Sequence, residues 1–151
     1  MSGAPTEAQA KQAQELAQRT ADLLFAGDQT SRRLGMKIVQ IAPGRARVSM
    51  LVRADMLNGH GSCHGGVLFS LADSAFAFAC NSYNAVTVAA AATIDFLIPA
   101  TQGDELTAVA IELWRSRRNG VYDVAVVNQR QECVALFRGR CHQLDGKLLS
   151  D

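Results

Sequence analysis

A long apolar segment near the middle of the chain limits the folds that the sequence can adopt. Residues 58–80, NGHGSCHGGVLFSLADSAFAFAC, read as a Gly/His-rich turn followed by a helix from about Gly66 to Cys80. Asp73 is the one Asp, Glu, Lys or Arg between positions 56 and 94. A helix that is apolar on nearly every face must be covered on all sides. A curved sheet can wrap most of it, and we expect the uncovered remainder, with any open edge strand, to favour dimerisation.

Strand-forming segments surround this helix. Before it, an alternating run predicts a strand at Arg45–Ala54. We expect this strand to pair with a shorter one at Met36–Ile41, across the turn Pro43-Gly44. After it, an exit loop at residues 81–84 leads to four predicted strands: Val86–Leu97, Glu105–Trp114, Val121–Gln129 and Cys133–His142. Asn119-Gly120, in the connection 115–120, is a turn dipeptide. The pattern predicts an α+β fold, an antiparallel sheet wrapped around one long central helix.

The N-terminal segment is predicted to form a further helix. Thr6–Ala26 is rich in Ala, Gln, Glu and Leu, and Gly27 follows as a stop. We expect the start of this helix to be frayed. At 151 residues the chain fits one domain, 1–151, in which residues 1–30 form a helical extension and residues 145–151 a tail.

Charge and cysteine usage argue against several function classes. With 15 Lys+Arg and 14 Asp+Glu the net charge is +1, so no overall field favours nucleic acid or an anionic membrane. The N-terminus has no apolar signal-peptide region, and the apolar run around Asp73 is shorter than the roughly 20 residues of a membrane span. The four cysteines form no CxxC pair. We therefore expect a cytoplasmic protein with reduced thiols, no nucleic-acid partner and no membrane partner.

Asp73 has two interpretations. An ionised carboxylate in apolar surroundings is costly without compensating partners, and Asp is a poor helix former. It is either a structural group that bonds Ser70 or Ser74 or faces solvent, or a catalytic nucleophile or general base beside a cleft. The residue alone does not decide between them.

The turn before the helix favours catalysis. Backbone N–H groups at a helix start lack intrahelical partners and point outward, so those of Gly65 and Gly66 suit a developing oxyanion. Paired glycines can also simply allow a tight entry into a crowded helix. Gly65 and Asp73 are eight residues apart, about 12 Å along one helix at ~1.5 Å per residue. Since both cannot contact one carbonyl from the same chain, we predict a site at the interface of a two-fold dimer.

The remaining polar residues of the turn are Asn58, His60, Cys63 and His64. Asn58 can bond a substrate carbonyl or orient a water, but Asn-Gly is also an ordinary turn pair. A metal site is the minor interpretation, because the His and Cys spacing matches no common zinc signature. Cys63 is not predicted to be a thiol nucleophile, since adjacent side chains point in different directions.

Together these residues resemble a known family. The segments MLNGHGSCHGGVLFSLADSAFAFACNS, TIDFL-x-P, NGVYDV and VALFRG are similar to the hotdog-fold acyl-CoA thioesterases, specifically the phenylacetic-acid-degradation (PaaI) type, the hydroxyphenylacetyl-CoA thioesterases. The resemblance runs from about Leu34 to His142. It implies a hotdog fold, a homodimer with a continuous sheet and commonly a homotetramer, and no cofactor apart from the coenzyme A of the substrate.

The resemblance also implies roles for single residues. Asp73 takes the place of the catalytic carboxylate, as nucleophile or as base for water. The Gly65 N–H corresponds to the group that polarises the thioester carbonyl. Asn58 and His64 match polar positions that line the site, and Ser74 falls where the family often has Thr.

Further candidates would contact the substrate. Gly66 lies beside the oxyanion donor, and three aromatic residues can line an aryl pocket or pack in the core: Phe69, Phe76 and Tyr83. Ile98 stands where relatives are expected to have a basic residue, which puts one contact to the CoA phosphates in doubt. Two arginine sets can bind these phosphates instead, or can be solvated charges: Arg138 and Arg140 on one face of the last strand, and Arg115, Arg117 and Arg118 in a turn.

The sequence thus predicts hydrolysis of aryl-acyl-CoA thioesters, such as phenylacetyl-CoA or hydroxyphenylacetyl-CoA, in phenylacetate degradation. One alternative is a non-catalytic acyl-CoA-binding hotdog protein, which has little use for a carboxylate at the reacting carbon. The other is a hotdog hydratase or dehydratase. That reaction would usually need a catalytic His on the helix, and the helix has none after His64.

Overall fold

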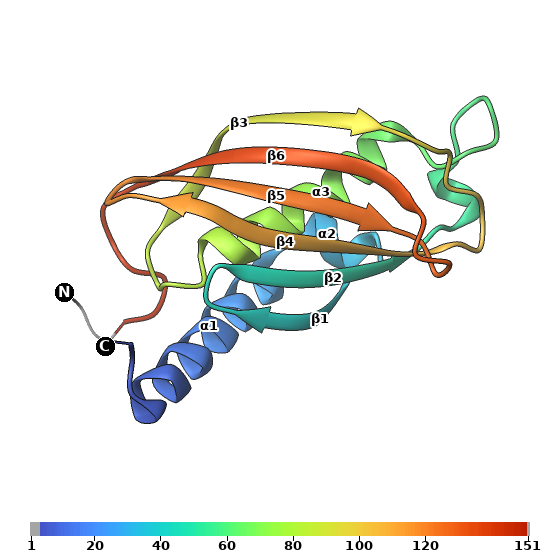
Figure 1. Cartoon of the computed structure of the whole chain (residues 1–151). Coiled ribbons are helices and arrows are strands. Elements are labelled where there is room, and N and C mark those ends of the chain that lie inside the picture. The colour runs from blue at the N-terminus through green and yellow to red at the C-terminus, as the bar shows by residue number, and fades with distance from the viewer. Residues whose placement is uncertain (1–3, 151) are drawn as a thin grey trace.

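A curved antiparallel sheet covers a central helix in the computed structural model, which describes residues 4–150 (Figure 1). The strand order is β1-β2-β4-β5-β6-β3, so β1 and β3 are the edges. Their bounds are β1 (Lys37–Ala42), β2 (Arg45–Leu51), β3 (Thr87–Phe96), β4 (Glu105–Arg115), β5 (Asn119–Val127) and β6 (Cys133–Gln143). The structure confirms the predicted antiparallel sheet around one helix, and the predicted first hairpin.

The central helix, α3 (Gly65–Cys80), packs its apolar side under the sheet. Its fully buried positions include Leu71 and the small residues Ala72 and Ala75. The small side chains let the strands approach the helix closely. The Phe76 ring lies against β6, where a Cβ added to Gly139 would be 2.8 Å from that ring. Glycine at this point of β6 therefore makes room for the largest apolar side chain in the middle of α3.

One side of α3 is only half-buried in the single chain. We call it the Asp73 face; it consists of Val67, Ser70, Asp73, Ser74 and Ala77. The sheet covers one side of the helix and the N-terminal helices cover only part of the other, so one chain leaves the uncovered remainder that the sequence predicts. The uncovered stripe carries the helix's one charged residue.

Two helices precede the sheet, α1 (Glu7–Gly27) and α2 (Gln29–Arg33). The start of α1 is not frayed as expected, because Thr6 and Gln9 form a capping box. Phe25 packs against Phe78 of α3, with ring centres 6.2 Å apart. The short helix α2 was not predicted; Asp28 ends α1 and caps α2. Within residues 4–150 no helix is long and apolar enough to cross a membrane.

Two predicted boundaries are wrong. The strand predicted to reach Ala54 ends at Leu51, because Val52 leaves the β-ladder to bond Asp104 and a 3-10 turn (Ala54–Met56) follows. Asn119-Gly120 lies at the start of β5 rather than in the turn. The turn is closed by the Ser116 N–H, which donates to the Asn119 carbonyl.

Candidate active site

A groove of about 330 Å³ opens at the N-terminal end of α3. We call it the Gly65 cavity; its walls include Asn58, Gly65, Leu68, Phe96, Leu97 and Ile98. The loop before α3 contributes polar groups to one side, and the end of β3 with the residues after it forms an apolar wall on the other. The structure thus brings together two predicted site residues, Asn58 and Gly65, beside a surface that suits an apolar acyl group.

The N-terminus of α3 presents one free donor rather than the two predicted. His64 is the N-cap residue, and its ring Nδ1 accepts the Gly66 N–H at 2.9 Å. The His64 carbonyl accepts the N–H groups of Val67 and Leu68. Within residues 4–150 the Gly65 N–H has no hydrogen-bond partner. The expectation that Gly66 also offers a free N–H is therefore wrong, and His64 acts first as a cap.

The absence of a side chain at Gly65 keeps this donor accessible. A Cβ built at this position would lie 3.0 Å from the tip of the Phe96 ring. Phe96 is 54% exposed at the end of β3. Glycine therefore leaves open the narrow space between the free N–H and the aromatic wall of the cavity.

Asn58 organises the loop that borders the cavity. Its Oδ1 accepts the N–H groups of His60 at 2.9 Å and Ser62 at 3.3 Å, so the turn interpretation is confirmed. Burial raises the pKa of the Cys63 thiol to about 11, which keeps it protonated near neutral pH. Within the described residues no three His, Cys, Asp or Glu side chains are arranged to hold a metal ion.

Asp73 lies two turns further along α3 and does not line the Gly65 cavity. Within residues 4–150 nothing hydrogen-bonds its carboxylate: Ser70 donates to the Gly66 carbonyl, and Ser74 bonds Ser31. The interpretation as a structural carboxylate bonded to Ser70 or Ser74 is therefore wrong. Burial, and then the negative charge of Asp28, raise the pKa of Asp73.

Sequence reasoning missed Asp28 and Ser31, which approach the Asp73 face from α2. Asp28 accepts hydrogen bonds from both the N–H and the hydroxyl of Ser31. The local signal was an Asp directly after the stop Gly27 with a Ser three positions on, which is typical of a helix N-cap. Nothing local indicated that this cap would contact α3.

The three aromatic candidates lie in different environments. Phe69 is half-buried and packs edge-on against Phe137, with ring centres 5.3 Å apart. Phe76 is 1% exposed and packs against both Phe137 and Tyr122, so it belongs to the core rather than to a pocket. Tyr83 donates to Glu112 at 2.9 Å, at the opposite end of α3 from Gly65.

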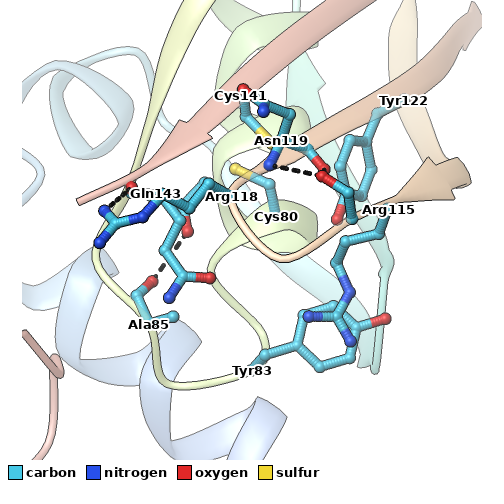
Figure 2. Close-up of a pocket in the computed structure, with 11 residues that line it drawn as sticks. Cys80, Tyr83, Ala85, Arg115, Arg118, Asn119, Tyr122, Cys141 and Gln143 are labelled. Carbon is cyan, nitrogen blue, oxygen red and sulfur yellow. Dashed lines mark hydrogen bonds between the residues drawn. The ribbon is translucent and has the colours of Figure 1, made fainter. Parts of the chain in front are cut away.

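A second, much smaller cavity lies at that opposite end (Figure 2). The Arg115 guanidinium stacks on the Tyr83 ring at 3.7 Å from its centre, and Arg118 pairs with Asp145 at 2.8 Å. Cys80 and Cys141 bring their thiols together between them. This end of α3 is held by its own contacts and contains none of the predicted catalytic residues.

The two arginines of β6 differ. Arg138 forms a two-pronged ion pair with Asp123, at 2.6 and 2.9 Å. Arg140 is exposed next to Trp114 and has no ion-pair partner within residues 4–150. Neither lines the Gly65 cavity of its own chain.

Known proteins resemble the chain over most of its length. The family model of the thioesterase superfamily matches residues 60–135. Acyl-coenzyme A thioesterase PaaI of Escherichia coli K12 is 49% identical over 133 residues, which are 88% of this chain and 95% of that protein. The solved structure of the E. coli PaaI protein, from the phenylacetic acid degradation operon, has a TM-score of 0.88 at 49% identity and covers 89% of this chain and 98% of that one. A Streptococcus mutans structure bound to acetyl CoA has a TM-score of 0.71 at 28% identity, over 74% of this chain and 90% of that one.

Proposed function

The chain belongs to the thioesterase superfamily and is an acyl-CoA thioesterase of the PaaI type with a hotdog fold, and on this basis we propose that it hydrolyses aryl-acyl-CoA thioesters. Phenylacetyl-CoA and hydroxyphenylacetyl-CoA are the proposed substrates, and the free acid and CoA are the products. The free Gly65 N–H beside the apolar wall of the Gly65 cavity carries this proposal. Asp73 on the same helix supports it, because its carboxylate has no hydrogen-bond partner within residues 4–150.

In the proposed mechanism the aryl group occupies the Gly65 cavity and the thioester oxygen accepts the Gly65 N–H. Asp73 of the partner subunit attacks the carbonyl carbon, or takes a proton from a water whose oxygen does so. Negative charge then develops on the carbonyl oxygen, where one oriented donor stabilises the transition state by about 3 kcal/mol. If Asp73 attacks, the C–S bond breaks, CoA leaves as the thiolate, and water hydrolyses the anhydride to the free acid and the Asp73 carboxylate, with one water proton passing to the thiolate. If water attacks, the C–S bond breaks to give the free acid directly, and Asp73 gives the proton that it took from the water to the CoA thiolate.

The proposed dimer follows from the edge strand β3. This strand has ten residues, is rich in alanine and contains only one charged residue, Asp95. Within residues 4–150 its outer edge has no strand partner. A long edge strand with so few charges is prone to pair with another strand. Two-fold pairing of β3 with a second β3 would extend the sheet and set two α3 helices side by side in opposite directions, with tetramers formed from two such dimers.

Proline at the edge of β3 tests this arrangement. Ala90 is the extra residue in the ladder between β3 and β6, a position where proline is tolerated within one chain. We expect Ala90→Pro to remain folded but to become monomeric in analytical ultracentrifugation and to lose turnover. Val39 is the corresponding extra residue of the other edge strand, β1, so Val39→Pro is the matched control and should keep the dimer. A dimeric Ala90→Pro would argue against pairing through β3.

A panel of CoA thioesters tests the proposed substrate class. We expect kcat/KM for phenylacetyl-CoA to exceed that for hexanoyl-CoA by about tenfold or more, because the rigid ring packs against the apolar wall of the cavity without the ordering cost of a flexible chain. The release of the CoA thiol measures both. A higher kcat/KM for aliphatic than for aryl substrates would contradict the aryl preference.

Three further assignments accompany the proposal. The mechanism uses no cofactor other than the CoA of the substrate. Arg140 is a better candidate than Arg138 for the CoA phosphates, because Asp123 already neutralises Arg138. A cytoplasmic location stays a prediction.

A further inference from the structure

The N-terminal extension brings a short chain of hydrogen bonds to the Asp73 face. The Asp28 carboxylate accepts the Ser31 N–H at 2.9 Å and also the Ser31 hydroxyl. Ser31 is fully buried, and its Oγ lies 2.7 Å from the Oγ of Ser74 on α3. Figure 1 shows α2 beside α3 at this point. Asp28 and Ser31 lie outside residues 60–135, the part that the superfamily model matches.

The chain of bonds has a fixed direction. Ser31 has one hydroxyl hydrogen, and the ionised Asp28 carboxylate can only accept it. In the contact between the two serines the hydrogen must therefore come from Ser74. The only hydrogen of the Ser74 hydroxyl then points at Ser31, so Ser74 can offer only its oxygen lone pairs to a group bound at the Asp73 face. Ser74 is thereby fixed as an acceptor.

Asp28 also acts on Asp73 through its charge. Within residues 4–150 it is the charged group that raises the pKa of Asp73, in addition to burial. Asp73 in turn raises the pKa of the Cys80 thiol, on the same helix. Within the described part of the chain no side chain of the sheet shifts the pKa of Asp73. Asp28 therefore makes Asp73 a stronger base than burial alone would.

We propose that Asp28 and Ser31 are positioning residues of the active site, which hold Ser74 as a hydrogen-bond acceptor and keep a second negative charge beside Asp73. This inference rests on the proposed role of Asp73 as the catalytic carboxylate. A water molecule at the Asp73 face can donate one hydrogen to Asp73 and the other to Ser74, which turns its lone pair toward the thioester carbon. Ser74, as an acceptor, cannot stabilise the oxyanion, so that task is left to Gly65.

Asp28→Asn tests both effects in the full-length enzyme. The amide removes the charge, and its N–H can donate to Ser31, which frees the Ser31 hydrogen for Ser74 and reverses the chain. We expect kcat for phenylacetyl-CoA to fall about 3- to 10-fold, the scale of one hydrogen bond, with KM unchanged. The acid limb of the profile of kcat against pH should move to lower pH, because the pKa of Asp73 falls when the neighbouring charge is lost. Asp22→Asn, an exposed carboxylate of α1 bonded to Gln18, is the control and should leave the profile unchanged.

Ser31→Ala separates the hydroxyl from the charge. It deletes the link to Ser74 but leaves Asp28 ionised, so we expect a similar fall in kcat without the shift of the acid limb. In a Ser74→Ala background the same change should cost nothing further, because the partner is already gone. Thr20→Ala is the control: it removes a buried hydroxyl of α1 whose partners within residues 4–150 are two carbonyls of its own helix. Thermal unfolding of each variant reports whether the fold is kept.

Two results would overturn this inference. One is an Asp28→Asn enzyme with wild-type kcat and an unmoved acid limb. The other is a double-mutant cycle in which the losses of kcat from Ser31→Ala and Ser74→Ala add, which would show that Ser31 does not act through Ser74. Either result, with an inactive Asp73→Asn, leaves the proposed function standing. An active Asp73→Asn would instead overturn the catalytic carboxylate and this inference with it.

Discussion

Asp73→Asn is expected to lower kcat for phenylacetyl-CoA by about a thousandfold while the fold is kept. The amide can neither attack the thioester carbon nor take a proton from water, and loss of a positioned base or nucleophile costs on the order of 10²–10⁴ in rate. The change is nearly isosteric, and within residues 4–150 it breaks no hydrogen bond of the Asp73 side chain. Release of the CoA thiol is the measurement. Near-normal hydrolysis by a folded variant would contradict the assignment.

The stability of the same variant gives an independent check. The folded-state pKa of Asp73 is raised, mainly by burial, so the folded protein holds a proton there that the unfolded chain gives up. This contribution to stability is present below the unfolded pKa and is lost as pH rises through the folded pKa. Asn does not titrate, so the variant should unfold at a slightly higher temperature than wild type at neutral pH, with the gap closing in acid. A higher unfolding temperature of the inactive variant is expected when a catalytic group lowers the stability of the wild-type protein.

Gly65→Pro is expected to lower kcat by about 10²–10³, the loss typical of removing one oxyanion donor. Proline removes the N–H that the mechanism uses, and it does so at the first position of α3, where helices accept proline readily. The preceding His64 has φ −60° and ψ 133°, a conformation that residues before proline prefer. Because the Gly65 N–H has no partner within residues 4–150, the helix loses no bond.

Gly65→Ala is the matched control for this variant. Its methyl group meets the Phe96 ring at 3.0 Å, as a proline Cβ would, but the N–H remains. We expect a loss of activity much smaller than that of the proline variant, because Phe96 lies at the surface and can move aside. Equal losses in the two variants would show that the bulk of the side chain matters rather than the donor.

Much of the fold could be predicted because its signals are local. The apolar run of α3, the alternation along β2 and the turn residues between the later strands each indicate one structure. The end of β2 could not be predicted, because Val52 continues the alternation although the ladder has already stopped. The five residues of α2 are too few to show a helical period, and the contact of Ser31 with Ser74 joins positions 43 residues apart.

The site could be predicted at residues whose type does not suit the local structure around them. Asp73 in an apolar helix and the glycines at its start are such residues. The misassigned residues have two causes. The His64 ring turns back onto the Gly66 N–H as a local helix cap, and Phe76 fits a space that Gly139 leaves on a distant strand. Sequence spacing alone does not contain these contacts.

The central claim is that Gly65 and Asp73 act on one substrate from different subunits. A hybrid dimer tests it most directly: Asp73→Asn and Gly65→Pro chains carry different affinity tags, are produced together, and the mixed dimer is purified through both tags. One site would combine the Gly65 of the Asp73→Asn chain with the Asp73 of the Gly65→Pro chain and would be intact, whereas the other site would carry both substitutions. We therefore predict about half the kcat of the wild-type dimer. Activity no higher than that of the two parent variants, in a hybrid of confirmed composition, would contradict a shared site.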